Sequence, residues 1–209
     1  MKIFYAFVLL TFLGLVILGC SESSDQLVAP VEKASTLSLE KSVIHAATGS
    51  AHWKIVSGSG QSRVRFSFSA IQHANGDFTG EVQNNDQGPT FNFHGNVFDL
   101  KVEGNTAKFA FKFTSGTYYG IPLEDWYGVD ISELTAWCVV IDNDISGSDV
   151  ASWILWTDGS DIGTGTIEEL NAMGPQEYLD WVENYLAPMY GFPFEDFIPT
   201  IQNGNIQVR

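Results

Sequence analysis

Strict alternation of apolar and polar residues over short stretches is the feature that most constrains the fold of this chain. Residues 63–70 alternate Arg-Val-Arg-Phe-Ser-Phe-Ser-Ala, and residues 98–103 and 108–113 alternate in the same manner. Successive side chains of a β-strand point to opposite faces of the sheet, so this period predicts strands with one apolar face and one polar face.

Turn residues separate these stretches at short intervals. Asn75-Gly76-Asp77 and Glu103-Gly104-Asn105 have the composition of tight turns. Further strands are expected at residues 52–56, 78–82, 90–94, 136–141, 151–156 and 206–208. About eight short antiparallel strands predict a mainly β fold, either a small antiparallel β-barrel or a sandwich. A closed barrel would leave no strand edge free to aggregate.

Two helices are expected as a late insertion, at about residues 166–187. Thr166 and Glu169 have the spacing of a capping box for a short first helix. Pro175 suits the first turn of a second helix, and Pro188 should stop it. Its apolar face would comprise Tyr178, Leu179, Trp181, Val182, Tyr185 and Leu186. We expect this helix to pack on the core or across one barrel end; the alternative is a lid or partner-docking element over the barrel mouth.

The first 19 residues have the three parts of a secretory signal. Lys2 supplies a positive charge, residues 3–17 are apolar apart from Thr11, and small residues precede Cys20. The apolar part is short for a full bilayer crossing, although an uncleaved transmembrane helix is the alternative interpretation.

The end of this segment, Ile17-Leu18-Gly19-Cys20, resembles the bacterial lipobox. The resemblance implies that Cys20 is lipidated and becomes the mature N-terminus, which makes the protein a bacterial lipoprotein of the cell envelope. No aspartate follows Cys20 directly. The resemblance therefore implies an address at the outer membrane.

The expected organisation has three parts: a signal peptide at 1–19, a flexible tether at 20–50, and one barrel-like domain at 51–209. The chain has two cysteines. If Cys20 carries lipid, Cys138 has no partner, which excludes a disulfide-stapled fold and a cysteine-rich zinc site. Cys138 lies in an apolar stretch and is expected to be a small buried residue, with a catalytic nucleophile as the alternative.

Acidic residues dominate the charge of the chain. It has 10 Lys+Arg against 25 Asp+Glu, and no Lys or Arg lies between Phe113 and Val208. Such a surface repels nucleic acid, because binding to phosphates needs a basic footprint. Solubility explains the charge most simply; a cationic partner or bound calcium are the functional alternatives.

One segment is a candidate calcium site. Asp142, Asp144 and Ser146 place oxygen ligands at alternate positions before Gly147, as in the opening of an EF-hand loop, and Asp149 adds a carboxylate. A true EF-hand is excluded because Trp153 stands where the bidentate glutamate belongs and strands flank the loop. A polar turn is the alternative. No other cofactor is expected.

The sequence identifies no catalytic residue. The four histidines lack the spacing of metal ligands, and no nucleophile elbow or phosphate loop occurs. Carboxylate pairs such as Glu124-Asp125 leave a glycoside hydrolase open. Aromatic residues, among them Tyr118-Tyr119 and Trp126-Tyr127, are candidates for a sugar- or lipid-binding face.

Seven short motifs occur in an order that resembles an uncharacterised family of secreted bacterial β domains. They are Gly58-Ser59-Gly60, residues 66–70, 73–76, 93–95, 102–105, 140–143 and 204–208. The resemblance implies export and a β fold, but no activity. We therefore expect a lipid-anchored envelope protein that binds a small apolar or glycan ligand or a protein partner. The alternative is an envelope hydrolase that acts through acidic residues at the barrel mouth.

Overall fold

The computed structural model describes residues 42–57, 60–86, 91–144, 149–152, 154–160, 166–191, 193–198, 201 and 203–209. The expected signal peptide, Cys20 and most of the expected tether lie outside these residues. Strand β1 begins at Val43. The sheet therefore includes residues 43–50, which the sequence analysis had given to the tether.

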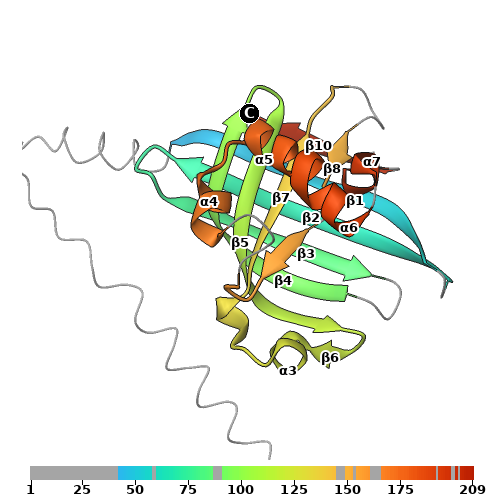
Figure 1. The fold of residues 1–209 in the computed structure, drawn as a ribbon. Coiled ribbons are helices and arrows are strands. Elements are labelled where there is room, and N and C mark those ends of the chain that lie inside the picture. Colours follow the sequence, from blue (N-terminus) through green and yellow to red (C-terminus); the bar gives the residue numbers. More distant parts are fainter. Residues whose placement is uncertain are drawn as a thin grey trace, which may run out of the picture. The chain divides into compact units, whose positions relative to one another are not determined.

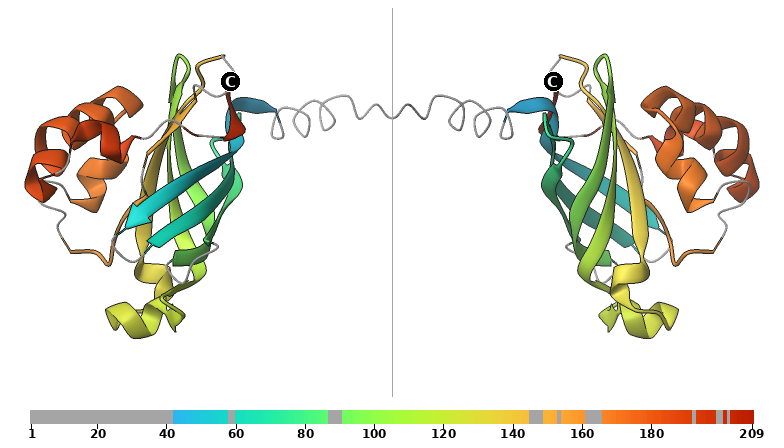
Figure 2. Two further views of the ribbon diagram at one scale, coloured as in Figure 1. Left: turned by 90° about the vertical axis from the view of Figure 1, so that its right-hand side faces the viewer. Right: turned by 90° about the vertical axis from the view of Figure 1, so that its left-hand side faces the viewer.

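One antiparallel sheet forms the body of the domain and curls into a half-barrel (Figures 1 and 2). Along the path β10-β1-β2-β3-β4-β5-β7-β8, neighbouring strands are hydrogen-bonded, while β6 pairs with β5 and β9 with β7. The strands are β1 (Val43–Ser57), β2 (Gly60–His73), β3 (Phe78–Asp86), β4 (Phe91–Glu103), β5 (Thr106–Tyr118), β6 (Ile121–Pro122), β7 (Thr135–Ile141), β8 (Val150–Ala151), β9 (Leu155–Thr157) and β10 (Asn203–Val208). The mainly β, antiparallel fold predicted from the alternation is confirmed. The strands expected separately at 90–94 and 98–102 form the single strand β4.

Aromatic side chains fill the inner face of the curl. The rings of Phe68 and Phe109 stack with their centroids 5.0 Å apart, and those of Phe93 and Phe111 stack at 5.6 Å. These residues are buried in one apolar cluster with the inward side chains of β1, β2 and β7. Each buried phenylalanine contributes roughly 1.5–3 kcal/mol. The alternating pattern in the sequence therefore supplies the inner core directly.

A helical layer covers part of the opposite face of the sheet (Figure 2). Its elements are α4 (Ile167–Ala172), α5 (Pro175–Trp181), the π-helical turn η2 (Val182–Leu186), α6 (Ala187–Tyr190) and α7 (Phe194–Phe197). The late helices are confirmed, and both hydrogen bonds of the Thr166–Glu169 capping box are present. The helices pack against Ala110, Trp137 and Val139, which point outward from β5 and β7. The expectation that the second helix packs on the core is thus correct.

Pro188 does not stop the helix, contrary to the sequence analysis. The helix continues through Pro188 to Tyr190, and Gly191 follows in the left-handed conformation. In η2 the backbone N–H of Ala187 donates to the carbonyl of Val182, five residues back. A proline ring normally clashes with the carbonyl four residues earlier, and a widened turn is a known way to accommodate it.

Two lysines hold the helical layer on the sheet. Lys108 of β5 is only 1% exposed, and its Nζ donates to the carbonyls of Leu170 and Met173. Lys101, its cross-strand neighbour on β4, donates to the carbonyls of Asn171 and Ala172. The last carbonyls of a helix have no partner within the helix and carry partial negative charge. The two ammonium groups of the sheet therefore cap the C-terminal end of α4.

Other contacts support this capping. Trp137 Nε1 donates to the side chain of Asn171 over 2.8 Å, and the carboxylate of Glu103 accepts from the backbone N–H of Gln176. The Lys108 ammonium also lies 5.5 Å from the ring centre of Tyr178. The sequence analysis placed Lys108 on a polar strand face, whereas the helical layer buries it.

The pH dependence of stability should reveal this buried lysine. Burial, followed by the charge of Lys101, lowers the pKa of Lys108 from 10.5 to about 8, while Asp99 and Glu177 oppose the shift. The folded protein then releases this proton at lower pH than the unfolded chain. The Lys108 contribution to the free energy of unfolding should therefore rise between pH 8 and pH 10.5.

Chemical denaturation across this pH range checks the prediction. A Lys108→Met variant should lack the rise, because it has no proton to release. Lys112→Met is the matched control on the same strand, since Lys112 Nζ makes only a long, exposed contact with the carbonyl of Glu133. If the free energy of unfolding depended on pH in the same way in wild type and in Lys108→Met, the interpretation would be contradicted.

Two aspartates join the strands that lie at opposite ends of the sheet order. The N–H groups of Ile206 and Val208 on β10 point away from β1. They donate instead to Asp149 Oδ2, over 2.9 Å, and to Asp142 Oδ2, over 3.2 Å. Asp149 precedes β8 and Asp142 follows β7. We call this junction between β10 and the β7–β8 region the seam. Side-chain carboxylates there take the place of hydrogen bonds between two backbones.

Removal of the Asp149 carboxylate should destabilise the fold. Its other oxygen accepts from the N–H of Asn143, so Asp149→Ala leaves two backbone donors without this acceptor. We expect a loss of about 3 kcal/mol, and a smaller loss for Asp149→Asn, which keeps one acceptor. Urea denaturation measures both, with the exposed Asp125→Ala as the control. If Asp149→Ala lowers the free energy of unfolding no more than Asp125→Ala does, Asp149 does not stabilise the seam.

Candidate functional site

A polar groove of about 460 Å³ lies at the end of β3, β4 and β5. Its far wall comes from β6, the short helix α3 (Leu123–Tyr127) and the 3-10 turn η1 (Ile131–Glu133). We call β6, α3 and η1 together the tip. The groove is lined by Asn84, Asn85, Asn92, Phe93, His94, Thr114, Ser115, Gly116, Thr117, Pro122, Glu124 and Ile131.

Close packing positions the tip beside the strands. Leu123 is buried over Gly116, where an added Cβ would lie 2.6 Å from Leu123 Cδ1 and 3.0 Å from Phe93 Cβ. A larger residue at position 116 would push Leu123 aside, so glycine favours this close approach of α3 to β5. On the other side, Trp156 Nε1 of β9 donates to the hydroxyl of Tyr127 over 2.8 Å. The wall of the groove is thus fixed from two directions.

Two of the groove asparagines serve the fold. Asn84 Nδ2 donates to the carbonyl of Phe91, and Asn92 Oδ1 accepts from the N–H of Asp86, each over 2.7 Å. Across the described part of the chain, six other polar lining side chains form no side-chain hydrogen bond within the protein: those of Asn85, His94, Thr114, Ser115, Thr117 and Glu124. An amide, an imidazole, three hydroxyls and one carboxylate are therefore available to a ligand.

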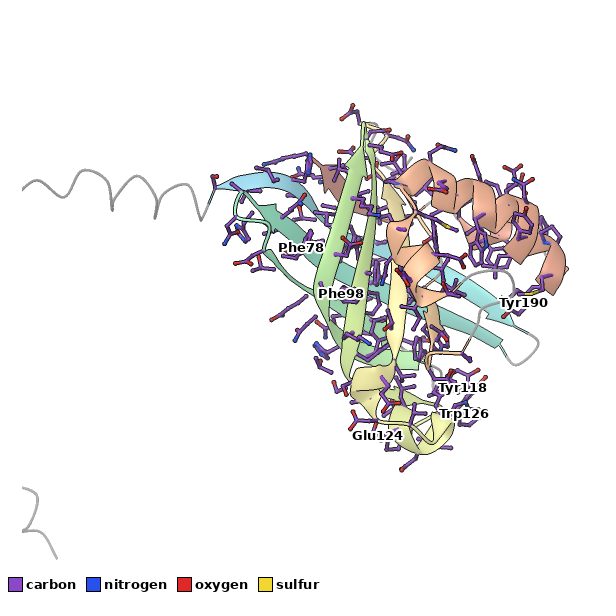
Figure 3. All side chains as sticks on the ribbon, turned by 60° about the vertical axis from the view of Figure 1, so that its left-hand side comes forward. Phe78, Phe98, Tyr118, Glu124, Trp126 and Tyr190 are labelled. Atoms are coloured by element: carbon purple, nitrogen blue, oxygen red, sulfur yellow. The ribbon has the colours of Figure 1, made fainter. Side chains whose placement is uncertain are left out.

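Exposed aromatic side chains surround the other side of the tip. The ring centroid of Tyr118 lies 4.7 Å from that of Tyr119 and 4.8 Å from that of Trp126, and both pairs are arranged edge to face. Tyr119 is 51% exposed and Trp126 47% exposed. Figure 3 shows Tyr118 and Trp126 together at the tip, with Glu124 on the same short helix. None of these three rings lines the groove.

The expected calcium ligands have backbone partners in the structure. Both oxygens of Asp149 and both oxygens of Asp142 accept from backbone N–H groups, and Asp144 N is one of these donors. Ser146 lies outside the described residues. No group of three or more His, Cys, Asp or Glu side chains among the described residues could hold a metal ion. Calcium binding at Asp142, Asp144, Ser146 and Asp149 stays a prediction, while the seam gives two of these carboxylates a role in the fold.

Cys138 is fully buried on the inner face of β7, as expected for a small apolar residue. Burial raises the pKa of its thiol to about 12, against a smaller opposing effect of the Ser152 hydroxyl. The reactive species of a cysteine is the thiolate, so this thiol is inert at neutral pH. The nucleophile alternative has no support here.

The histidines are scattered. His45 Nδ1 lies 2.9 Å from Gln72 Oε1, and His73 Nε2 lies 2.8 Å from Thr79 Oγ1, so each bonds a neighbouring side chain within the sheet region. His94 lines the groove. The candidate carboxylates Glu124 and Asp125 are both exposed on α3, and only Glu124 lines the groove.

Sequence reasoning named the aromatic pairs but not the groove. Its lining residues come from positions 84–131, and neither their order nor their spacing forms a motif. The irregular register between His94 and Gly95, opposite Thr114, is what brings Thr114 and Ser115 to the groove. Such a bulge has no clear sequence signal.

The fold defines a curled antiparallel β domain with a helical layer on one face and a polar groove at one end. No protein-family model, no curated protein and no solved structure matches this chain significantly. The resemblance to secreted bacterial β domains therefore stays a prediction. None of the helices in the described ranges is long and apolar enough to cross a membrane.

Proposed function

We propose that this protein is a lipid-anchored cell-envelope protein whose β domain binds a neutral glycan in the polar groove. The observation that carries the proposal is a groove of about 460 Å³ in which six polar lining side chains form no hydrogen bond to any described residue. Ligand sites of this size combine apolar surface with a few well-placed polar groups.

The chemistry of the lining favours a sugar over an apolar ligand. Sugar hydroxyls both donate and accept hydrogen bonds, which suits the amide of Asn85, the ring of His94 and the hydroxyls of Ser115 and Thr117. An apolar ligand would leave the polar groups without water or partner, which costs free energy.

A neutral ligand suits the groove better than an anionic one. Among the described residues that line it, none is Lys or Arg, and Glu124 contributes a negative charge. The groove also offers only this one carboxylate next to the hydroxyls. Glycoside hydrolysis generally needs two carboxylates across the scissile bond. No observation therefore favours the hydrolase as a second candidate.

A glycan array of neutral hexose and N-acetylhexosamine oligosaccharides tests the proposal. Protein purified from cells that express the full chain should bind at least one member. Thr117→Val should weaken the Kd about tenfold, equivalent to about 1.4 kcal/mol, as measured by calorimetry. Thr117→Val nearly preserves shape and removes only the hydroxyl.

Tyr185→Ala is the control, because Tyr185 is exposed on the helical layer and does not line the groove. It should leave glycan binding unchanged. Absence of binding to every array member, or binding that only the control variant disturbs, would refute a glycan site in the groove.

The lipid anchor rests on the lipobox-like Ile17-Leu18-Gly19-Cys20 and has its own test. Cys20→Ser should abolish incorporation of a labelled fatty acid and move the protein from the membrane fraction to the soluble fraction. Two acyl chains hold a protein at a bilayer far more firmly than one. Cys138→Ala, which changes the second cysteine of the chain, should keep label and fractionation; unchanged labelling of Cys20→Ser would exclude the anchor.

A further inference from the structure

The helical layer has apolar side chains on two faces. Tyr178, Leu179 and Trp181 are buried against the sheet. Tyr185, Met189 and Tyr190, in contrast, are 56%, 52% and 56% exposed. The sequence analysis had counted Tyr185 with the buried face. Large apolar side chains grouped on a surface mark interaction sites more often than single ones do.

These three residues form what we call the docking face. Tyr185 and Met189 are four residues apart along η2 and α6, a spacing at which side chains are neighbours on a helix, and Tyr190 follows Met189 at the end of α6. Tyr190 also lies 6.4 Å, ring to ring, from Phe197 of α7. None of the three docking-face residues lines the groove, whose described lining residues lie on β3 to β6, α3 and η1. The docking face is therefore separate from the groove.

Every charged residue of the helical layer is acidic. Seven carboxylates lie between residues 167 and 197, all of them on exposed residues, and no Lys or Arg occurs there: Glu168, Glu169, Glu177, Asp180, Glu183, Glu195 and Asp196. Lys101 and Lys108 of the sheet lie beneath the layer, where their ammonium groups donate to carbonyls at the end of α4. The docking face is thus an apolar patch within an uncompensated negative surface.

We propose that the docking face binds a cationic amphipathic segment of another envelope protein. Lys or Arg side chains of such a segment would meet Glu183, Glu195 and Asp196, while its apolar side chains cover Tyr185 and Tyr190. A second copy of this chain would bring like charges together. An anionic lipid surface would be repelled in the same way. Charge complementarity therefore selects a basic partner.

The test uses three synthetic helical peptides and protein purified from cells that express the full chain. The first peptide carries Lys and Leu at amphipathic spacing, the second has Glu in place of Lys, and the third has Ser in place of Leu. By fluorescence anisotropy, only the Lys/Leu peptide should bind tightly, and its affinity should fall as salt is added. Tight binding of the Glu/Leu peptide, or equal binding of the Lys/Ser peptide, would overturn the proposal.

Variants locate the interaction. The triple variant Tyr185→Ser, Met189→Ser, Tyr190→Ser should bind the Lys/Leu peptide at least tenfold more weakly. Circular dichroism and the melting temperature verify that it folds. The control, Tyr119→Ser with Ile121→Ser, removes exposed apolar residues from the tip and should bind as wild type; an equal loss in both variants would overturn the assignment.

Two further measurements distinguish other occupants. Sedimentation that shows dimers of wild type but monomers of the triple variant would assign the face to a second copy of the chain. Flotation of a Cys20→Ser protein with phosphatidylglycerol vesicles, lost in the triple variant, would assign it to the membrane. Either result would overturn a cationic partner, and neither involves the glycan site.

Discussion

The contact of Lys101 and Lys108 with the end of α4 is the interaction on which the two-layered domain depends. The two lysines are directly opposite each other on β4 and β5, an arrangement that by itself is unfavourable. It is tolerated because four helix carbonyls converge on the two ammonium groups. Loss of either partner would leave buried charge or unpaired carbonyls. The stabilisation is mutual. The carbonyls at the end of α4 pair the lysines that the sheet would otherwise bury alone, and the lysines satisfy carbonyls that have no partner within the helix.

A second constraint is the seam between β10 and the β7–β8 region. A strongly curled sheet has two edges whose free N–H groups invite other strands. Here Asp142 and Asp149 cover the N–H groups of β10 with side-chain oxygens. The same aspartates made this segment resemble the opening of a calcium-binding loop. One acidic turn can fit both a metal site and a hydrogen-bonded seam, because carboxylate oxygens coordinate metal ions and also accept hydrogen bonds from N–H groups.

The two proposed surfaces follow from these constraints. Leu123 packing over Gly116 holds the tip beside the strands and opens the groove, whereas the lysine contacts hold the helical layer and turn Tyr185, Met189 and Tyr190 outward. Because the groove and the docking face are on different elements, a ligand and a protein partner could bind independently. Internal use of Lys101 and Lys108 as helix caps also accounts for the purely acidic outer surface of the helices.

The sequence by itself determined the antiparallel strands, the capping box at Thr166 and the start of α5 at Pro175, because each depends on neighbours a few residues apart. It also determined that Cys138 is buried, since Cys138 lies within the apolar run from Ala136 to Ile141. Tertiary structure alone decided that Lys108 is internal, that the helix runs through Pro188, that His94 and Thr117 share a groove, and that Asp149 closes the sheet. These properties depend on residues distant in the chain: Leu170 lies 62 positions from Lys108, and Ile206 lies 57 from Asp149. No local period or spacing encodes contacts of that range.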